Sequence, residues 1–163
     1  MKTPPPTLRV VDLGHRPYGP VLALQEKTLE DRVAGRTGDT LFLVEHDAVY
    51  TLGRNAHEAN LLASPDDLKR MGIDVAATTR GGDITYHGPG QIVGYPILNI
   101  RERGLTVVEF VGMIEQALLS VLAHYGIEGG MDPKARGVWV GDCKIAAIGV
   151  RVSRQVSMHG FAF

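Results

Sequence analysis

The stretch "RGVWVGDCKIAAIGVRVSRQVSMHGFAF", Arg136–Phe163, is rich in β-branched and aromatic residues and is interrupted at "GD" and at "SRQ". This pattern predicts consecutive β-strands joined by short turns. Further strands are predicted at residues 7–14 (TLRVVDLG), 40–46 (TLFLVEH), 48–54 (AVYTLGR), 73–80 (IDVAATTR), 83–87 (DITYH) and 91–100 (QIVGYPILNI). Internal Gly94 and Pro96 indicate that the last of these forms a bulge or an edge strand.

Helices are predicted between these strands. Residues 18–35 carry apolar side chains at helical spacing, and Ser64 is predicted to cap a short helix that starts at Pro65. The clearest helix covers residues 105–126, with a predicted apolar stripe of Val107, Val111, Ile114, Leu118, Val121, Leu122 and Tyr125. Because long runs of strands follow one another, the order predicts an α+β fold, in which helices flank a mainly antiparallel or mixed sheet.

Length and composition limit the class of protein. The 163 residues suit a single domain, 1–163, with a sizeable core. Seventeen basic and eighteen acidic residues give a net charge of −1, which indicates no nucleic-acid partner. The N-terminus lacks the apolar core of a signal peptide, and Pro4–Pro6 predict a stiff, extended lead-in. No apolar run is expected to reach the length of a membrane span, so we expect a cytoplasmic protein with no membrane partner.

The segment "RGGDITYHGPGQ", residues 80–91, combines glycine clusters with a polar and aromatic strand. If residues 83–87 form a strand, Asp83, Thr85 and His87 share one face, and Ile84 and Tyr86 share the other. One interpretation is two tight turns around a strand with a hydrogen-bonded histidine. The other is a binding or catalytic site, because glycines let the backbone come close to a ligand. The segment matches neither a Walker loop nor a dinucleotide fingerprint.

A metal site is not predicted. None of the six histidines is paired at helical i, i+4 spacing, and one cysteine cannot form a thiolate cage.

Cys143 and Lys144 are neighbours in the sequence, and a nearby ammonium lowers the pKa of a thiol. Strand alternation argues against such a pair here, because successive side chains point to opposite faces. Lys144 is expected to share a face with Ala146 and Ile148. It is interpreted either as a strand-end lysine that faces water or as a buried lysine with a functional role.

Blocks of this sequence resemble the lipoyl(octanoyl) transferases, relatives of the lipoate and biotin protein ligases. The similar blocks are "LFLVEHDAVYTLGR", "RGGDITYHGPGQIVGYPILNI", "GVWVGDCKIAAIGVRV" and "SMHGFAF", and they follow the family's order. A single arginine before Gly81-Gly82 favours the transferases over the ATP-dependent lipoate ligases. The resemblance implies the biotin/lipoate protein ligase-like catalytic domain.

The implied activity is transfer of an octanoyl group from octanoyl-acyl carrier protein to a lysine of a lipoyl domain. The implied acceptors are subunits of 2-oxoacid dehydrogenases and the glycine cleavage H protein. A cysteine forms an acyl thioester that yields an amide, and this step needs neither ATP nor a cofactor.

The resemblance also implies the site residues. Lys144 matches the lysine that lowers the pKa of the nucleophilic cysteine. The implied binding residues are Arg80, Gly81, Gly82, Asp83, Ile84, Thr85, Tyr86, His87, Ala147, Ile148, Gly149, Gly160, Phe161 and Ala162.

In the family the nucleophile follows the "HGFA" block in a Pro-Cys-Gly context. We therefore expect it beyond Phe163, in a segment missing from a C-terminally truncated chain. The alternatives are a non-catalytic module that binds acyl chains or acyl carrier protein, and a relative of the ATP-dependent ligases.

Overall fold

The computed structural model describes residues 7–132 and 134–163, and the predicted lead-in at Pro4–Pro6 lies outside them. Three helices alternate with groups of strands. In chain order the elements are β1 (Leu8–Arg16), α1 (Tyr18–Val33), β2 (Asp39–His46), β3 (Val49–Leu52), a 3-10 turn (Glu58–Asn60), α2 (Pro65–Met71), β4 (Asp74–Ala77), β5 (Ile84–His87), β6 (Val93–Ile97), α3 (Val107–His124), β7 (Gly130–Asp132), β8 (Ala135–Val140), β9 (Cys143–Ser153) and β10 (Val156–Ala162). The predicted strands and helices are confirmed, while β7 and the 3-10 turn were not predicted.

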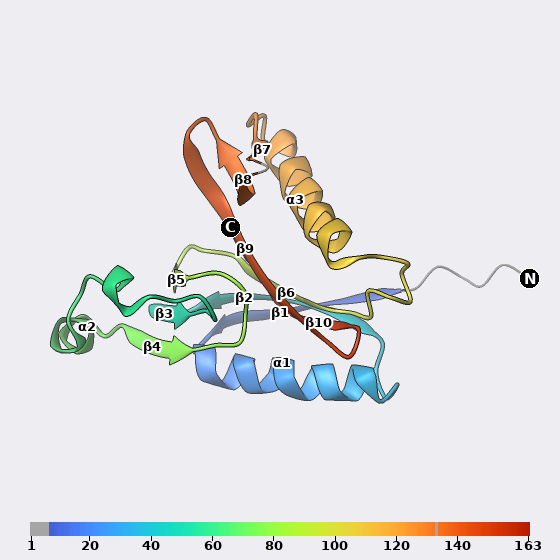
Figure 1. Cartoon of the computed structure of the whole chain (residues 1–163), viewed down its shortest axis with the longest axis horizontal. Helices are drawn as coiled ribbons and strands as arrows, with labels where there is room; N and C mark the ends of the chain where they lie inside the picture. The colour runs from blue at the N-terminus through green and yellow to red at the C-terminus, as the bar shows by residue number, and fades with distance from the viewer. Residues whose placement is uncertain (1–6, 133) are drawn as a thin grey trace, which may run out of the picture.

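The strands form two sheets (Figure 1). The larger sheet has the order β1-β2-β6-β10-β9-β8-β7, and the smaller has the order β4-β3-β5. The β1–β2 and β3–β4 pairs are parallel, whereas the other neighbours are antiparallel. Helix α1 supplies the crossover that a parallel β1–β2 pair requires. The predicted α+β class with a mixed sheet flanked by helices is therefore confirmed.

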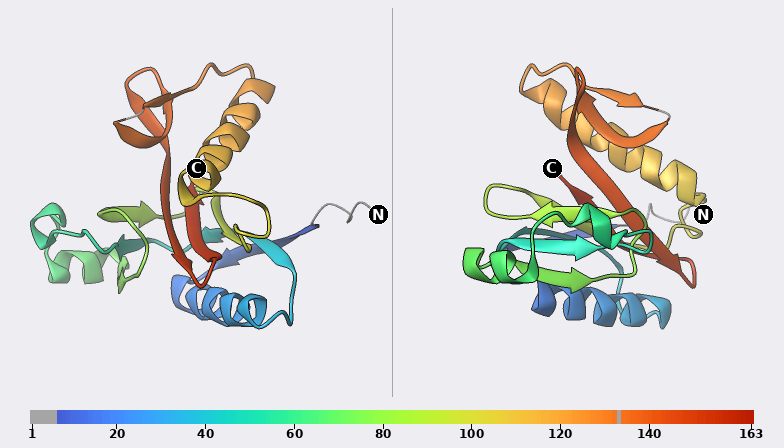
Figure 2. Two further views of the ribbon diagram at one scale, coloured as in Figure 1. Left: turned by 45° about the vertical axis from the view of Figure 1, so that its right-hand side comes forward. Right: turned by 60° about the vertical axis from the view of Figure 1, so that its left-hand side comes forward.

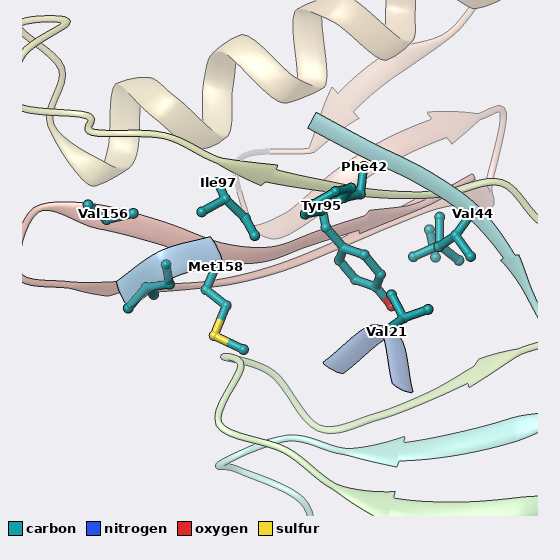
Figure 3. Close-up of a cluster of buried hydrophobic side chains, with 10 residues drawn as sticks. Val21, Phe42, Val44, Tyr95, Ile97, Val156 and Met158 are labelled. Atoms are coloured by element: carbon teal, nitrogen blue, oxygen red, sulfur yellow. The ribbon is translucent and has the colours of Figure 1, made fainter. Parts of the chain in front are cut away.

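The two long helices lie on opposite sides of the larger sheet (Figures 1 and 2). On the α1 side, Val21 packs with Phe42, Tyr95 and Met158 in a core of buried residues (Figure 3). On the α3 side, Phe110 and its neighbours along the helix pack on β8 and β9. The large sheet is thus covered on both faces, and its central strands are buried.

Strand β6 is central, so the prediction of a bulge or an edge at Gly94 and Pro96 was wrong. It lies between β2 and β10, and all five of its residues are buried. Proline lacks an N–H for the ladder. The neighbouring main-chain groups are satisfied by the Ser157 hydroxyl on β10, which donates to the Pro96 carbonyl at 2.7 Å and accepts from the Leu98 N–H at 3.1 Å.

Helix α3 begins with a capping box, in which Thr106 and Glu109 exchange hydrogen bonds. The predicted apolar stripe is only partly correct, because Val107, Val121 and Tyr125 are exposed. The residues that α3 buries are Phe110, Ile114, Glu115, Leu118 and Leu122. Apolar side chains occur on more than one side of this helix, so spacing alone did not identify the packed face.

By length and composition alone, α3 is apolar enough to cross a membrane, contrary to the expectation from the sequence. Core helices of soluble proteins meet the same criterion, so this finding is weak evidence for a membrane span.

Candidate active site

A cavity of about 310 Å³ lies where the segment before β5 meets β9 and β10. Its walls come from α1, β6 and β8 as well, so residues distant in the sequence meet there. The lining residues are Tyr18, Arg80, Gly81, Gly82, Asp83, Ile84, Thr85, His87, Val93, Tyr95, Arg136, Lys144, Ala147, Ile148, Gly149, His159, Gly160, Phe161 and Ala162.

The predicted binding residues all line this cavity except Tyr86. Its neighbours Ile84, Thr85 and His87 on β5 contribute to the wall, but the Tyr86 ring packs against Tyr50, with 5.3 Å between centroids. Tyr86, which was predicted as a binding residue, thus does not line this cavity, and the cross-strand pairing of β3 with β5 accounts for its position.

The glycine-containing loop at residues 80–83 is held by main-chain hydrogen bonds from the segment after β3. Gly53 N–H donates to the Asp83 carbonyl at 3.0 Å, Arg54 N–H to the Arg80 carbonyl at 3.0 Å and Asn55 N–H to the Gly82 carbonyl at 3.1 Å. On the other side, Gly81 N–H donates to the Val150 carbonyl of β9 at 3.1 Å. The loop is thus fixed between β9 and the segment that follows β3, and the Gly81 amide is not free to polarise a ligand.

The Asp83 carboxylate is engaged on the outside of this loop. It accepts hydrogen bonds from the His57 N–H, at 3.1 Å, and from the Asn60 side chain. Desolvation raises the pKa of Asp83, but these hydrogen bonds outweigh it and lower the pKa below its ordinary value. Asp83 therefore acts in the structure as a support for the loop.

Arg80 places a buried guanidinium in the cavity wall, with 7% of the residue exposed. It donates to the Thr51 carbonyl at 2.6 Å, to the Thr51 hydroxyl at 2.9 and 3.3 Å and to the Gly81 carbonyl at 3.0 Å. Among the described residues, no carboxylate forms an ion pair with it. Burial lowers the pKa of Arg80. A guanidinium nevertheless stays protonated in proteins, so Arg80 places a positive charge in the wall and donates its hydrogen bonds to neutral oxygens.

His87 is a neutral imidazole in this wall. Its Nδ1 lies 2.7 Å from the Gln91 side-chain oxygen, which accepts, so Nδ1 carries the proton. Its Nε2 lies 3.4 Å from the Thr51 hydroxyl. Burial lowers the pKa of His87 to about 4.

Two tyrosines of the wall were missed by the sequence analysis. The Tyr95 hydroxyl donates to His46 Nε2 at 2.9 Å, because His46 Nδ1–H is used by the Arg16 carbonyl at 2.9 Å. The Tyr18 ring is stacked with the ring of His87 at 6.3 Å. Burial raises the pKa of Tyr18 to about 12 and raises that of Tyr95 as well. Both phenols are therefore neutral, and they lie close enough to the Arg80 guanidinium for its charge to act on them.

His159 was also missed, although it precedes the predicted Gly160. The main-chain N–H of His159 donates to the Gln25 side-chain oxygen at 3.1 Å, and the ring Nε2 lies 3.2 Å from the Thr79 hydroxyl. Burial lowers the pKa of His159 to about 4. The block "SMHGFAF" held the only sequence signal for this residue.

Lys144 lines the cavity, whereas Cys143 is exposed and does not. Lys144 Nζ donates to the Arg136 carbonyl at 3.0 Å and lies 4.9 Å from the centre of the Trp139 ring. Ala146 was expected to share the face of Lys144, but it is buried in the α3 core and does not line the cavity. The β8–β9 register shifts between Val138 and Trp139, and this irregularity breaks the simple alternation.

Within residues 7–132 and 134–163, no group of three or more His, Cys, Asp or Glu residues lies close enough together to hold a metal ion.

Comparison with known proteins gives consistent matches. The family described as lipoyl protein ligase A/B catalytic domain matches residues 17–163. An octanoyltransferase of Solibacter usitatus is 53% identical over 150 residues, which cover 92% of this chain and 68% of the relative. Octanoyltransferases of Syntrophobacter fumaroxidans and Alkaliphilus metalliredigens are 48% and 51% identical, and the matches cover 67% and 72% of those proteins and 94% and 95% of this chain.

Solved structures show the same fold at low sequence identity. LipL1 of P. falciparum in complex with lipoate matches with a TM-score of 0.71 and 17% identity, covering 96% of this chain and 47% of that one. Lipoate-protein ligase A bound with ATP matches with a TM-score of 0.69 and 15% identity, covering 96% of this chain and 65% of the other.

Proposed function

Because this chain belongs to the octanoyltransferases, acyltransferases of the lipoyl protein ligase A/B family that act in lipoate biosynthesis, we propose that the cavity is its acyl site. We propose octanoyl-acyl carrier protein as the donor and a lysine of a lipoyl domain as the acceptor. One observation carries the proposal: the cavity brings Lys144 together with the loop at residues 80–83 and with residues 159–162.

The lining suits an acyl chain. Ile84, Val93, Ile148 and Phe161 supply apolar surface, and the neighbouring phenols and His87 are neutral. Each methylene that leaves water contributes about 0.8 kcal/mol. We propose that the tail lies against these apolar side chains, away from the charged Arg80 and Lys144 of the same wall, so that an octanoyl tail is favoured over a short acyl group by several methylenes.

The chemistry that we propose is thioester exchange followed by amide formation. A cysteine thiolate attacks the thioester carbonyl, and the carrier thiol leaves. The amine of the acceptor lysine then attacks the acyl-enzyme, so that an amide forms and the cysteine is regenerated. A thioester is more reactive than an amide, so the sequence of steps runs without ATP.

Lys144 is proposed to stabilise the thiolate, since a neighbouring ammonium lowers the pKa of a thiol. Cys143 is not proposed as the nucleophile, because it lies outside the cavity. Instead we propose a cysteine in sequence that follows Phe163, as in the Pro-Cys-Gly block of the family.

Intact-mass spectrometry after incubation with octanoyl-acyl carrier protein tests this function. The 163-residue chain is expected to gain no octanoyl group. The same chain extended by the C-terminal segment of the Solibacter usitatus octanoyltransferase is expected to gain one, and to pass it to a lipoyl domain. An adduct on the 163-residue chain that is lost in Cys143→Ser would contradict the proposed nucleophile. Binding without any adduct or transfer in the extended chain would identify a non-catalytic module, and transfer that requires ATP would identify a ligase.

A further inference from the structure

Glu115 is a carboxylate buried beneath α3, with 1% of the residue exposed. Both of its oxygens are used by β8. Oε1 accepts from the Gly137 N–H at 3.0 Å, and Oε2 accepts from Arg136 Nη1 at 2.9 Å. Burying a carboxylate is unfavourable unless it is paired and hydrogen-bonded. The Glu115 carboxylate therefore has to stay bound to Arg136 and Gly137 of β8.

That segment also carries the acceptor for Lys144. The Arg136 carbonyl, adjacent to the Gly137 N–H that Glu115 holds, accepts from Lys144 Nζ at 3.0 Å. Because the Arg136 carbonyl and the Gly137 N–H belong to one planar peptide unit, fixing the N–H fixes the carbonyl. The hydrogen bond from Gly137 to Glu115 therefore determines where the Lys144 acceptor lies.

Gly137 packs closely against the strand that carries Lys144. It has a φ of 130°, and a Cβ there would lie 2.3 Å from the Ala146 carbonyl and 3.4 Å from Lys144 Cε. Only glycine fits both the backbone conformation and the space. The peptide between Arg136 and Gly137 is thus held by α3 on one side and by β9 on the other.

A second contact places the same ammonium. Trp139 lies two residues further along β8, with Lys144 Nζ 4.9 Å from its ring centre, a cation–π distance. The indole N–H donates to the Ala135 carbonyl at 3.0 Å, which fixes the ring. Both contacts of the Lys144 ammonium therefore come from β8.

We propose that Glu115 is a positioning residue for Lys144: by holding the peptide between Arg136 and Gly137, it keeps the Lys144 ammonium at the cavity wall. An effect of Glu115 on the rate of octanoyl transfer rests on the proposed role of Lys144. An effect of Glu115 on where the Lys144 ammonium lies does not. Glu115 itself does not line the cavity.

Three variants of the extended, active protein test the proposal. Glu115→Gln keeps an oxygen for the Gly137 N–H, so it rescues the position of Lys144. Glu115→Leu leaves that N–H without an acceptor. Leu118→Ala, one turn along α3, removes buried packing without touching Gly137 and is the matched control for lost stability.

Two readouts are needed: steady-state transfer, and the emission of Trp139, the only tryptophan of the chain. In Glu115→Leu we expect kcat to fall by about tenfold, with KM for octanoyl-acyl carrier protein within about twofold of the wild type. Its Trp139 emission should match that of Lys144→Met, which removes the cation from the ring. Glu115→Gln and Leu118→Ala should keep the wild-type emission and kcat.

The proposal is overturned if Glu115→Leu keeps wild-type emission, or if Leu118→Ala lowers kcat as much as Glu115→Leu does. Should Glu115→Leu not fold, Gly137→Ala disturbs the same peptide from the β9 side, and wild-type emission in that variant overturns the proposal. If Lys144→Met transfers octanoyl groups at the wild-type rate, the proposed role of Lys144 fails, while the emission of Glu115→Leu still decides whether Glu115 positions it.

Discussion

The Arg80 guanidinium donates hydrogen bonds to both the side-chain hydroxyl and the main-chain carbonyl of Thr51. Thr51 is fully buried on β3, and Arg80 begins the loop that forms one wall of the cavity. The smaller sheet thereby fixes the loop through a side chain as well as through main-chain hydrogen bonds.

Thr51→Val is expected to lower the free energy of unfolding by about 2 kcal/mol, because it leaves the buried Arg80 Nε–H without its acceptor while the bond to the Thr51 carbonyl remains. Thr51→Ser keeps the hydroxyl and should stay within about 1 kcal/mol of the wild type. Urea denaturation measures both. Equal stability of the valine and serine variants would show that the hydroxyl contacts contribute little.

Gly53→Ala is expected to displace the loop at residues 80–83, because its Cβ would lie 2.3 Å from the Gly82 carbonyl and 2.9 Å from that of Asp83. We expect weaker binding of the acyl donor, seen as a raised KM for octanoyl-acyl carrier protein. The matched control is Gly112→Ala in α3, where a Cβ meets no atom within 4 Å. An unchanged KM in Gly53→Ala would mean that the loop adapts without affecting the cavity.

Lys144→Ala in the extended protein is expected to reduce octanoyl transfer by up to about thirtyfold, since a thiol with an ordinary pKa of about 8.5 is only about 3% thiolate at pH 7. Lys144 is exposed, so its loss should change the free energy of unfolding by less than about 0.5 kcal/mol. Cys143→Ser is the neighbouring control and should keep transfer within about twofold of the wild type. Full activity in Lys144→Ala would remove this lysine from the mechanism.

Stability is expected to fall as the pH drops from 6.5 towards 4. Burial lowers the pKa of His87 and of His159 to about 4, so between these pH values the unfolded chain binds more protons than the folded one. The loss is on the order of 2 kcal/mol for each histidine at pH 5. Urea unfolding at pH 7.5 and pH 5 measures it, and His87→Gln should remove part of the difference. The same pH dependence in that variant would contradict the assignment to His87.

The sequence allowed most of the strands to be predicted, because β-branched runs and turns mark them locally. The glycine clusters pointed to the loop at residues 80–83, whereas the segments of β9 and β10 that line the cavity were indicated by the resemblance to the transferase family. Tyr18, Thr51 and Tyr95 were missed because each belongs to an ordinary amphipathic or apolar element. Only the packing of α1 and β6 brings Tyr18 and Tyr95 to the cavity, and only the packing of β3 brings Thr51 to Arg80 in its wall.

Two predictions were wrong because each considered a strand without its neighbours in the sheet. Pro96 indicated an edge, but β10 pairs beside it, and Ser157 of that strand satisfies the Pro96 carbonyl and the Leu98 N–H. Likewise, Ala146 was placed beside Lys144 by simple alternation, but the register shift between β8 and β9 separates them. In both cases the partner strand, not the strand itself, decides the outcome.

The position of β10 affects how the protein folds while it is being synthesised. It is the last described strand in the chain, yet it lies in the middle of the larger sheet, between β6 and β9. Until the ribosome has released it, β6 and β9 each present an unpaired edge, and such edges promote aggregation. The nascent chain must therefore keep these edges apart until β10 inserts, and a slow translation step just before Val156 would prolong that exposure.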